Sequence, residues 1–327
     1  MEKIGLEWIR KFPCDLEFAQ TQTYEMCIEA VEENGLLLKD VRWDELNLTK
    51  EQIYKLCLIA VKQNGEALEY VKVQTEEICI EAVKEYGLAL QYVNNQTEKI
   101  CLEAVKENGG ALQYVNNQTD EICTEAVKNN GLNLCYVNNQ TEEICLEAVK
   151  EDGLALYYVK NQTPRICLEA VREYGDSLKY VKEQTPGLCL EAVRSRGKAL
   201  KFVKNQTEEI CIEAVKRKGS ALEYVKNKTE EICIEALKQN KYAIKYVKDK
   251  EKYENIFNIK YLKKQGEAKE VMAIKENGKW LFTVGCQEDI GFEEFIYRIY
   301  NEGGGFDPEK GINVHRQVYV DFLEQFK

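Results

Sequence analysis

Ten cysteines form a regular ladder along the chain, and thiols in such an array could bind metal or exchange disulfides. They recur every 22 residues from Cys79 to Cys233, and Cys27 and Cys57 extend the series towards the N-terminus. In stacked helices, equivalent atoms lie about 8–10 Å apart, whereas a disulfide needs Cα atoms within about 7 Å. A shared zinc ion needs sulfur atoms at about 2.3 Å from the metal. We therefore predict that each cysteine is a small buried residue at a helix–helix contact, and we expect no metal and no cofactor.

A second ladder consists of glutamates, which could act as paired carboxylates in acid–base catalysis. Its members are Glu81, Glu103, Glu125, Glu147, Glu169, Glu191, Glu213 and Glu235. Because an active site is a unique arrangement, the same carboxylate in every unit favours a structural role. We predict that each accepts hydrogen bonds from the adjoining repeat, from its threonine cap, turn amides or tyrosine hydroxyl. The tyrosines that recur with the same step are predicted to be core residues with a polar tip.

Signals of enzymatic chemistry are weak elsewhere. The only histidine, His315, has no nucleophile or carboxylate motif beside it. The run Gly303–Gly305 lacks the Lys-Ser/Thr of a phosphate-binding loop. We expect the protein not to be an enzyme, and an active site around Cys286 and His315 remains the alternative.

The ladders belong to a 22-residue repeat that predicts a helical hairpin. In one unit, Thr75 is a good N-cap, and the apolar positions of Ile78–Val83 lie on one helical face. Gly87 is predicted to end that helix in the left-handed conformation. Ala89–Val93 then gives a second, shorter apolar segment, and Asn94–Gln96 is the polar turn into the next cap. Helices this short need neighbouring units for stability.

The repeats predict a mainly α protein, an α-solenoid of about ten helical-hairpin repeats with a small C-terminal α+β domain. The solenoid is predicted over residues 1–250, with an N-terminal cap at 1–20 and repeats at 21–250. Between Cys27 and Cys57 the spacing is 30 residues, so an insertion around Arg42–Glu51 should loop out of the stack. Residues 251–327 form the predicted α+β domain, in which Asn277-Gly278 indicates a β-hairpin.

Composition and charge restrict the function classes. Hydrophobic residues make up 44% of the chain and charged residues 31%, which is typical of a folded protein without membrane segments. Thirteen cysteines without a secretory signal predict reduced thiols in a cytoplasmic protein. The formal net charge of −11 argues against direct nucleic-acid binding. The charge is uneven: residues 1–160 hold 29 acidic against 15 basic side chains, and residues 161–250 hold 13 against 19. Such a field steers charged partners.

The repeat T-x-x-I-C-x-E-A-V-K-x-x-G-x-A-L-x-Y-V-x-N-Q resembles a family of short helical repeats of unknown function. That family occurs in bacteria, their phages and giant viruses. The resemblance covers roughly residues 20–250 and depends on the Cys-x-x-Ala-Val and Ala-Leu-x-Tyr-Val blocks. It implies the fold, and it supplies no catalytic residues to transfer.

We therefore predict a non-enzymatic protein-binding repeat protein whose acidic N-terminal part engages a basic, nucleic-acid-binding surface of a partner. The short second helices vary most between units and are the predicted binding ridge. The candidate binding residues are Trp43, Asp44, Glu45, Glu66, Glu69, Glu76, Glu77, Gln91 and Gln113. The most specific version is a phage-type inhibitor of an RNA-guided nuclease, an anti-CRISPR-like protein. The alternative is an adaptor that recruits its partner through the C-terminal α+β domain.

Overall fold

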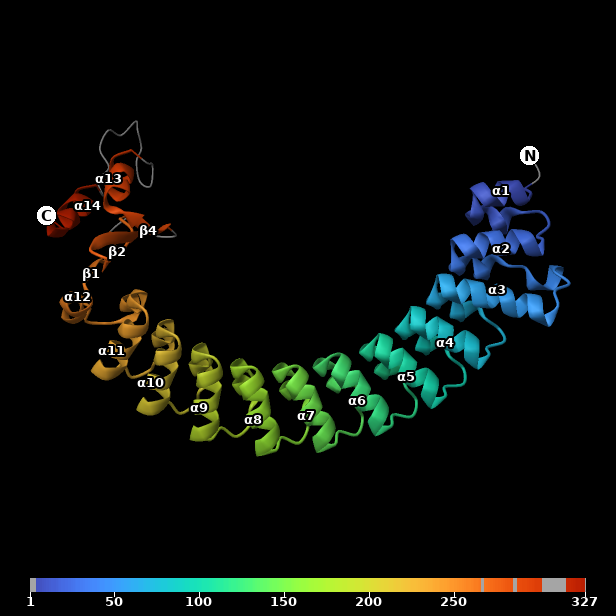
Figure 1. Cartoon of the computed structure of the whole chain (residues 1–327), viewed down its shortest axis with the longest axis horizontal. Coiled ribbons are helices and arrows are strands. Elements are labelled where there is room, and N and C mark those ends of the chain that lie inside the picture. Colours follow the sequence, from blue (N-terminus) through green and yellow to red (C-terminus); the bar gives the residue numbers. More distant parts are fainter. Residues whose placement is uncertain (1–3, 266–267, 285–286, 302–315, 327) are drawn as a thin grey trace. The chain divides into compact units, whose positions relative to one another are not determined.

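The computed structural model describes residues 4–265, 268–284, 287–301 and 316–326. The chain is mainly helical, with regular hairpin repeats followed by a small antiparallel sheet and further helices, as the sequence predicts (Figure 1). It divides into two compact units, Met1–Lys182 and Glu183–Lys327.

Each repeat is an α-helix followed by a six-residue 3-10 helix. In the first unit the α-helices are α2 (Tyr24–Glu33), α3 (Lys50–Gln63), α4 (Glu76–Glu85), α5 (Glu98–Glu107), α6 (Asp120–Asn129), α7 (Glu142–Glu151) and α8 (Pro164–Glu173). Their 3-10 helices are η2 (Gly35–Asp40), η4 (Gly65–Tyr70), η5 (Gly87–Tyr92), η6 (Gly109–Tyr114), η7 (Gly131–Tyr136), η8 (Gly153–Tyr158) and η9 (Gly175–Tyr180). The second unit contains α9 (Pro186–Ser195), η10 (Gly197–Phe202), α10 (Glu208–Arg217), η11 (Gly219–Tyr224), α11 (Glu230–Gln239) and η12 (Lys241–Tyr246).

The start of each α-helix follows the predicted capping chemistry. The Thr75 hydroxyl accepts a hydrogen bond from the Ile78 amide at 3.3 Å, which satisfies a backbone donor that the first turn leaves open. Pro164 and Pro186 occupy the first helical position, where a missing N–H has no consequence. Within each unit, successive α-helices pack side by side in one layer, and successive 3-10 helices pack side by side in the other.

The ladder glycines do not end the α-helices in the left-handed conformation, so that prediction was wrong. Tyr86 ends α4 in an extended conformation, and Gly87 is the first residue of η5. The glycine is needed for close approach instead. A Cβ atom at Gly87 would lie 2.6 Å from the Ala104 carbonyl oxygen of the next repeat. In η12 the same slot holds Lys241, and the element after η12 is α12 (Glu251–Phe257) rather than another repeat.

The two irregular parts of the first unit also use the hairpin plan. Helices α1 (Leu6–Lys11) and η1 (Pro13–Phe18), within the predicted cap, pack on α2 and η2 as a shortened hairpin. The insertion was predicted to loop out. In the structure it contains a 3-10 turn, η3 (Trp43–Glu45), then residues 46–49 without helix or strand, and it also lengthens α3 at its N-terminal end. Helix α3 has 14 residues where α4 has 10. Helix extension satisfies backbone hydrogen bonds that a loop would leave to water.

The C-terminal part of the second unit is a four-stranded antiparallel sheet with helices. Strands β1 (Ile259–Leu262), β2 (Val271–Glu276), β3 (Lys279–Val284) and β4 (Gln287–Gly291) lie in that order, followed by α13 (Phe292–Asn301), α14 (Arg316–Leu323) and η13 (Glu324–Phe326). Asn277 and Gly278 join β2 to β3 with positive φ angles of 49° and 79°, which confirms the predicted hairpin. Phe282, Phe295 and Phe322 form the centre of its core.

Candidate protein-binding face

A glutamine at the end of most polar turns links one repeat to the next. The Gln96 side chain donates to the Tyr114 carbonyl oxygen at 2.8 Å and accepts from the Asn116 amide at 3.0 Å. Equivalent pairs of bonds are made by Gln22, Gln74, Gln118, Gln140, Gln162, Gln184 and Gln206. From the sequence, these glutamines were assigned only to the polar turn between repeats, and their role in linking the repeats was missed. The signal available was their recurrence directly before eight of the threonine caps, with Leu48 and Lys228 as the exceptions.

The cysteine ladder is part of this scaffold. All ten ladder cysteines are buried, and the Cys101 thiol lies 3.7 Å from the Gln96 side-chain oxygen, to which it donates. Burial raises the pKa of the Cys123 and Cys145 thiols from 9.0 to about 11. A buried thiol with a raised pKa is a poor nucleophile and a poor metal ligand. Among the residues that the structure describes, no group of three or more His, Cys, Asp or Glu side chains could hold a metal ion.

Alkylation of the native protein with iodoacetamide at pH 8 is therefore expected to modify the exposed Cys14 well before Cys123 and Cys145. Because only the thiolate reacts, raising the pKa of Cys123 and Cys145 from 9.0 to about 11 lowers their thiolate fraction at pH 8 by roughly 100-fold, before any loss of access. Peptide mass spectrometry over time measures the rates, and urea-unfolded protein is the control in which the difference should disappear. Equal rates for Cys14 and Cys123 in the native protein would contradict this assignment.

At least six of the eight ladder glutamates pair with a lysine or an arginine: Glu81, Glu103, Glu147, Glu191, Glu213 and Glu235. Half-buried Glu81 lies 3.3 Å from Lys62 of the preceding repeat and 3.6 Å from Lys84 of its own helix. The partner of the threonine cap is a different glutamate: Thr119 donates to Glu98, in the first turn of α5, at 3.2 Å. The ladder glutamates lie on the α-helical layer, one helical turn before a lysine or arginine. Residues three apart on a helix are neighbours, so this spacing favours an ion pair.

Some of the lysines that make the later repeats basic also have a structural role. The Lys160 ammonium donates to the Asn138 carbonyl oxygen of the preceding turn at 2.9 Å, and Lys182 donates to the Lys160 carbonyl oxygen at 2.9 Å. In earlier repeats the same slot holds Asn94, Asn116 and Asn138. These lysines cover the carbonyl groups of turns and are not simply a positive surface.

The 3-10 layer is the face on which side chains remain available. We call the last two positions of the 3-10 helices η4 to η8 the tyrosine face, and its members are Glu69-Tyr70, Gln91-Tyr92, Gln113-Tyr114, Cys135-Tyr136 and Tyr157-Tyr158. The first residue of each pair is exposed. Tyr70, Tyr92 and Tyr114 are half-buried, and Tyr136 and Tyr158 are 37% and 36% exposed, so these rings lie at the edge of the core with part of each ring open. Tyr157 is 63% exposed and lies 5.0 Å, ring to ring, from Tyr158 and from Tyr180. Exposed aromatic side chains on a rigid layer are typical of protein-binding surfaces.

Carboxylates gather at one end of this face. Burial and the charges of Glu69 and Glu66 raise the pKa of Tyr92, and Asp40 joins them in raising the pKa of Tyr70. Burial raises the pKa of Asp40 too, the neighbouring Lys39 ammonium partly offsets this rise, and the charge of Glu17 adds to it. These carboxylates lie on the adjacent helices η1, η2 and η4, so they form one acidic region beside two tyrosine rings. Sequence reasoning included Glu66 and Glu69 but missed Glu17 and Asp40, which are far from them in the chain.

The structure separates the remaining predicted residues. Gln91 and Gln113 are exposed on the tyrosine face, next to the acidic region. Glu76 and Glu77 are exposed in the first turn of α4, on the α-helical layer, where Glu77 accepts a hydrogen bond from Tyr54 and raises its pKa. The nine predicted residues therefore do not form one surface.

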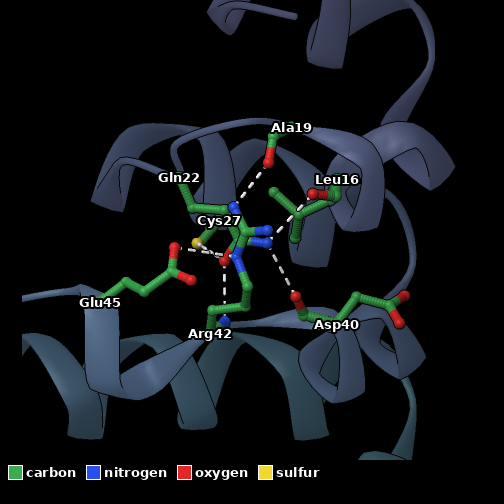
Figure 2. A network of polar contacts seen from close by, with 7 residues as sticks. All are labelled: Leu16, Ala19, Gln22, Cys27, Asp40, Arg42 and Glu45. Atoms are coloured by element: carbon green, nitrogen blue, oxygen red, sulfur yellow. Dashed lines mark hydrogen bonds and ion pairs between the residues drawn. The ribbon is translucent and has the colours of Figure 1, made fainter.

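The insertion residues belong to a polar network at the N-terminal end (Figure 2). The Arg42 side chain donates to the Ala19 carbonyl oxygen at 2.6 Å and pairs with Glu45 at 3.0 Å. Gln22 accepts from the Arg42 amide at 2.8 Å and donates to the Leu16 carbonyl oxygen at 3.0 Å. Trp43 is half-buried and Asp44 is exposed. Because Glu45 already has a cation partner, it contributes to the scaffold.

The repeats match the family described as domain of unknown function DUF4116. The matches cover residues 54–98, 75–119, 97–141, 119–162, 141–185, 185–229 and 207–251, which together are well over half of the chain. The chain belongs to this family. Each DUF4116 match spans about two consecutive hairpins, the length over which one glutamine link operates. Searches of curated proteins and of solved structures each found no match.

Three predicted features lie outside the described residues: Cys286, Gly303–Gly305 and His315. In the part of the chain that is described, no helix combines the length and apolar character needed to cross a bilayer.

Proposed function

We propose that this DUF4116 protein is a non-enzymatic scaffold that binds a basic protein surface through the 3-10 layer of its first unit. The observation that supports the proposal is the acidic region of Glu17, Asp40, Glu66 and Glu69 beside the exposed tyrosine face. Elsewhere in the repeats, the cysteine, glutamine and threonine ladders already have partners within the stack.

The partner is a protein with a cationic surface. Residues 1–160 carry 29 acidic against 15 basic side chains, a field that raises the association rate of a positive partner and disfavours nucleic acid itself. A protein groove that holds nucleic acid has the complementary charge. The most specific form of the proposal is therefore inhibition of an RNA-guided nuclease by occupation of that groove.

Charge reversal at Glu66 and Glu69 tests the proposal. The double variant Glu66→Lys/Glu69→Lys is expected to weaken capture of a candidate nuclease at least tenfold, because rim charges on this scale change both the association rate and the affinity. Pull-down and surface plasmon resonance at two salt concentrations measure the effect, and nuclease cleavage assays report inhibition.

The matched control is Glu85→Lys/Glu107→Lys, which changes the net charge equally on the exposed ends of α4 and α5. This control should retain most of the binding. Loss of binding that is equal in the two double variants would mean that only net charge matters, and unchanged binding in Glu66→Lys/Glu69→Lys would refute the acidic face.

A second candidate function, an adaptor acting through the C-terminal domain, is favoured by one observation. Trp280, Phe292, Phe326 and half-exposed Tyr297 line an open groove of about 870 Å³ between β3, α13 and η13. Binding that survives Glu66→Lys/Glu69→Lys but is lost in Trp280→Ala would assign the partner to this groove instead.

A further inference from the structure

We infer that the rings of the tyrosine face are binding sites for arginine side chains of the partner, with Tyr70 and Tyr92 as the strongest. This inference rests on the proposed function and names the contact that recognises the basic surface. We call Tyr70, Tyr92, Glu66 and Glu69 the tyrosine–carboxylate site.

The chain itself shows that the ladder rings accept a cation. The Lys179 ammonium lies over the Tyr180 ring at 4.4 Å from its centroid. Lys201 lies over Phe202 at 4.5 Å, and Lys245 lies over Tyr246 at 5.0 Å. In each case the lysine directly precedes the ring in its 3-10 helix. Phe202 shows that the ring face, and not the hydroxyl group, is what the cation contacts.

The same slot holds no lysine in η4 to η8. There the residue before the ring is Glu69, Gln91, Gln113, Cys135 or Tyr157. Among the described residues, no lysine or arginine lies over Tyr70, Tyr92 or Tyr114 in the way that Lys179 lies over Tyr180. In η4 to η8, a cation from another protein can therefore occupy the place that Lys179 fills at Tyr180.

The neighbouring carboxylates make two of these rings selective for positive charge. The charges of Glu66 and Glu69 act on the phenols of both Tyr70 and Tyr92. A guanidinium group can stack on a ring face and pair with a carboxylate at the same time. An ammonium group is smaller and more strongly hydrated, so it makes this combined contact less well. The occupant is therefore an arginine-bearing protein segment.

Filling the site from within the chain tests the inference. Gln91→Lys recreates the Lys179–Tyr180 arrangement at Tyr92 and should exclude a partner cation. The matched control is Asn94→Lys, which adds the same charge three residues away, in the slot where Lys160 contacts a turn carbonyl instead of a ring. The probe is a fluorescent peptide of alternating arginine and glycine, and fluorescence anisotropy gives its Kd.

Gln91→Lys is expected to weaken peptide binding about 2- to 5-fold more than Asn94→Lys does, the range that one exposed cation–π contact supports. Tyr92→Phe should bind like the parent protein, whereas Tyr92→Leu should lose the same 2- to 5-fold. Thermal unfolding checks that each variant is folded, and the two lysine variants provide the test even if Tyr92→Leu is unstable.

Equal effects of Gln91→Lys and Asn94→Lys, or unchanged binding in Tyr92→Leu, would overturn the inference. The same peptide-binding measurements distinguish failure of this inference from failure of the proposed function. If Glu66→Lys/Glu69→Lys abolishes binding while Tyr92→Leu does not change it, the acidic face binds without the rings. If Glu66→Lys/Glu69→Lys leaves binding unchanged, the proposed function itself is wrong.

Discussion

Replacement of Gly87 by alanine is expected to destabilise the first unit by about 2–4 kcal/mol, a cost typical of overpacking a tight contact. The added Cβ atom would lie 2.6 Å from the Ala104 carbonyl oxygen and 2.8 Å from the Asn108 Cβ atom. Both atoms belong to a helix held in place by its own neighbours, so the clash cannot be relieved by rotating a side chain. The repeats must separate locally, and that separation loses packing on both sides of η5.

Urea unfolding followed by circular dichroism measures the change in the free energy of unfolding. Hydrogen exchange adds a local measure, because α4, η5 and α5 should lose protection before the rest of the stack. The matched control is Gly187→Ala in the first turn of α9, where an added Cβ meets nothing within 4 Å. Alanine favours a helix over glycine by up to about 1 kcal/mol, so this control should be neutral or stabilising. A Gly87→Ala protein as stable as Gly187→Ala would show that the close contact is not essential.

The second large effect is expected for Gln96→Leu, which should cost about 2–4 kcal/mol. Leucine has a similar size but can neither donate to the Tyr114 carbonyl oxygen nor accept from the Asn116 amide, bonds of 2.8 Å and 3.0 Å in the structure. Two backbone groups between repeats are then left unpaired. The Cys101 thiol loses its acceptor as well.

The adjacent amide provides the control for Gln96→Leu. Asn95 is exposed, and Asn95→Ala should change the free energy of unfolding by less than about 0.5 kcal/mol. Gln96→Glu should lie between the two, since it keeps an acceptor for the Asn116 amide and loses the donor to Tyr114. If Gln96→Leu and Asn95→Ala unfold at the same urea concentration, the glutamine link does not stabilise the stack.

Both predictions concern contacts between repeats, and this is where sequence reasoning was weakest. The left-handed conformation predicted for Gly87 was a local explanation of a position that acts across a repeat boundary, and for Glu81 the adjoining repeat was expected to supply a partner but not a lysine. The structure shows Gly87 against Ala104, and Glu81 beside Lys62. Neither pair is close in sequence, and their contact depends on how far one hairpin is rotated and shifted relative to the next.

The candidate site shows the same division. Glu66, Glu69, Gln91 and Gln113 were predictable because they occupy variable slots in the second helix of each repeat, half-buried at Glu66 and exposed at the other three. Asp40 was missed because its helix η2 is separated from η4 by the insertion, which hides its register in the repeat. Glu76 and Glu77 were grouped with Glu66 by charge alone, but the turn before Thr75 carries the chain to the other layer.

The sequence by itself determined the hairpin repeat, its number of units, the threonine caps and the buried cysteines, because each depends on residues within one 22-residue period. The tertiary structure alone decided why the glycine and glutamine ladders exist, which layer each acidic residue faces, and that the tyrosine rings lie partly open. These properties depend on stacking geometry. A periodic sequence specifies what repeats, but only the packed neighbours determine which repeated side chains are already occupied and which remain available to a partner.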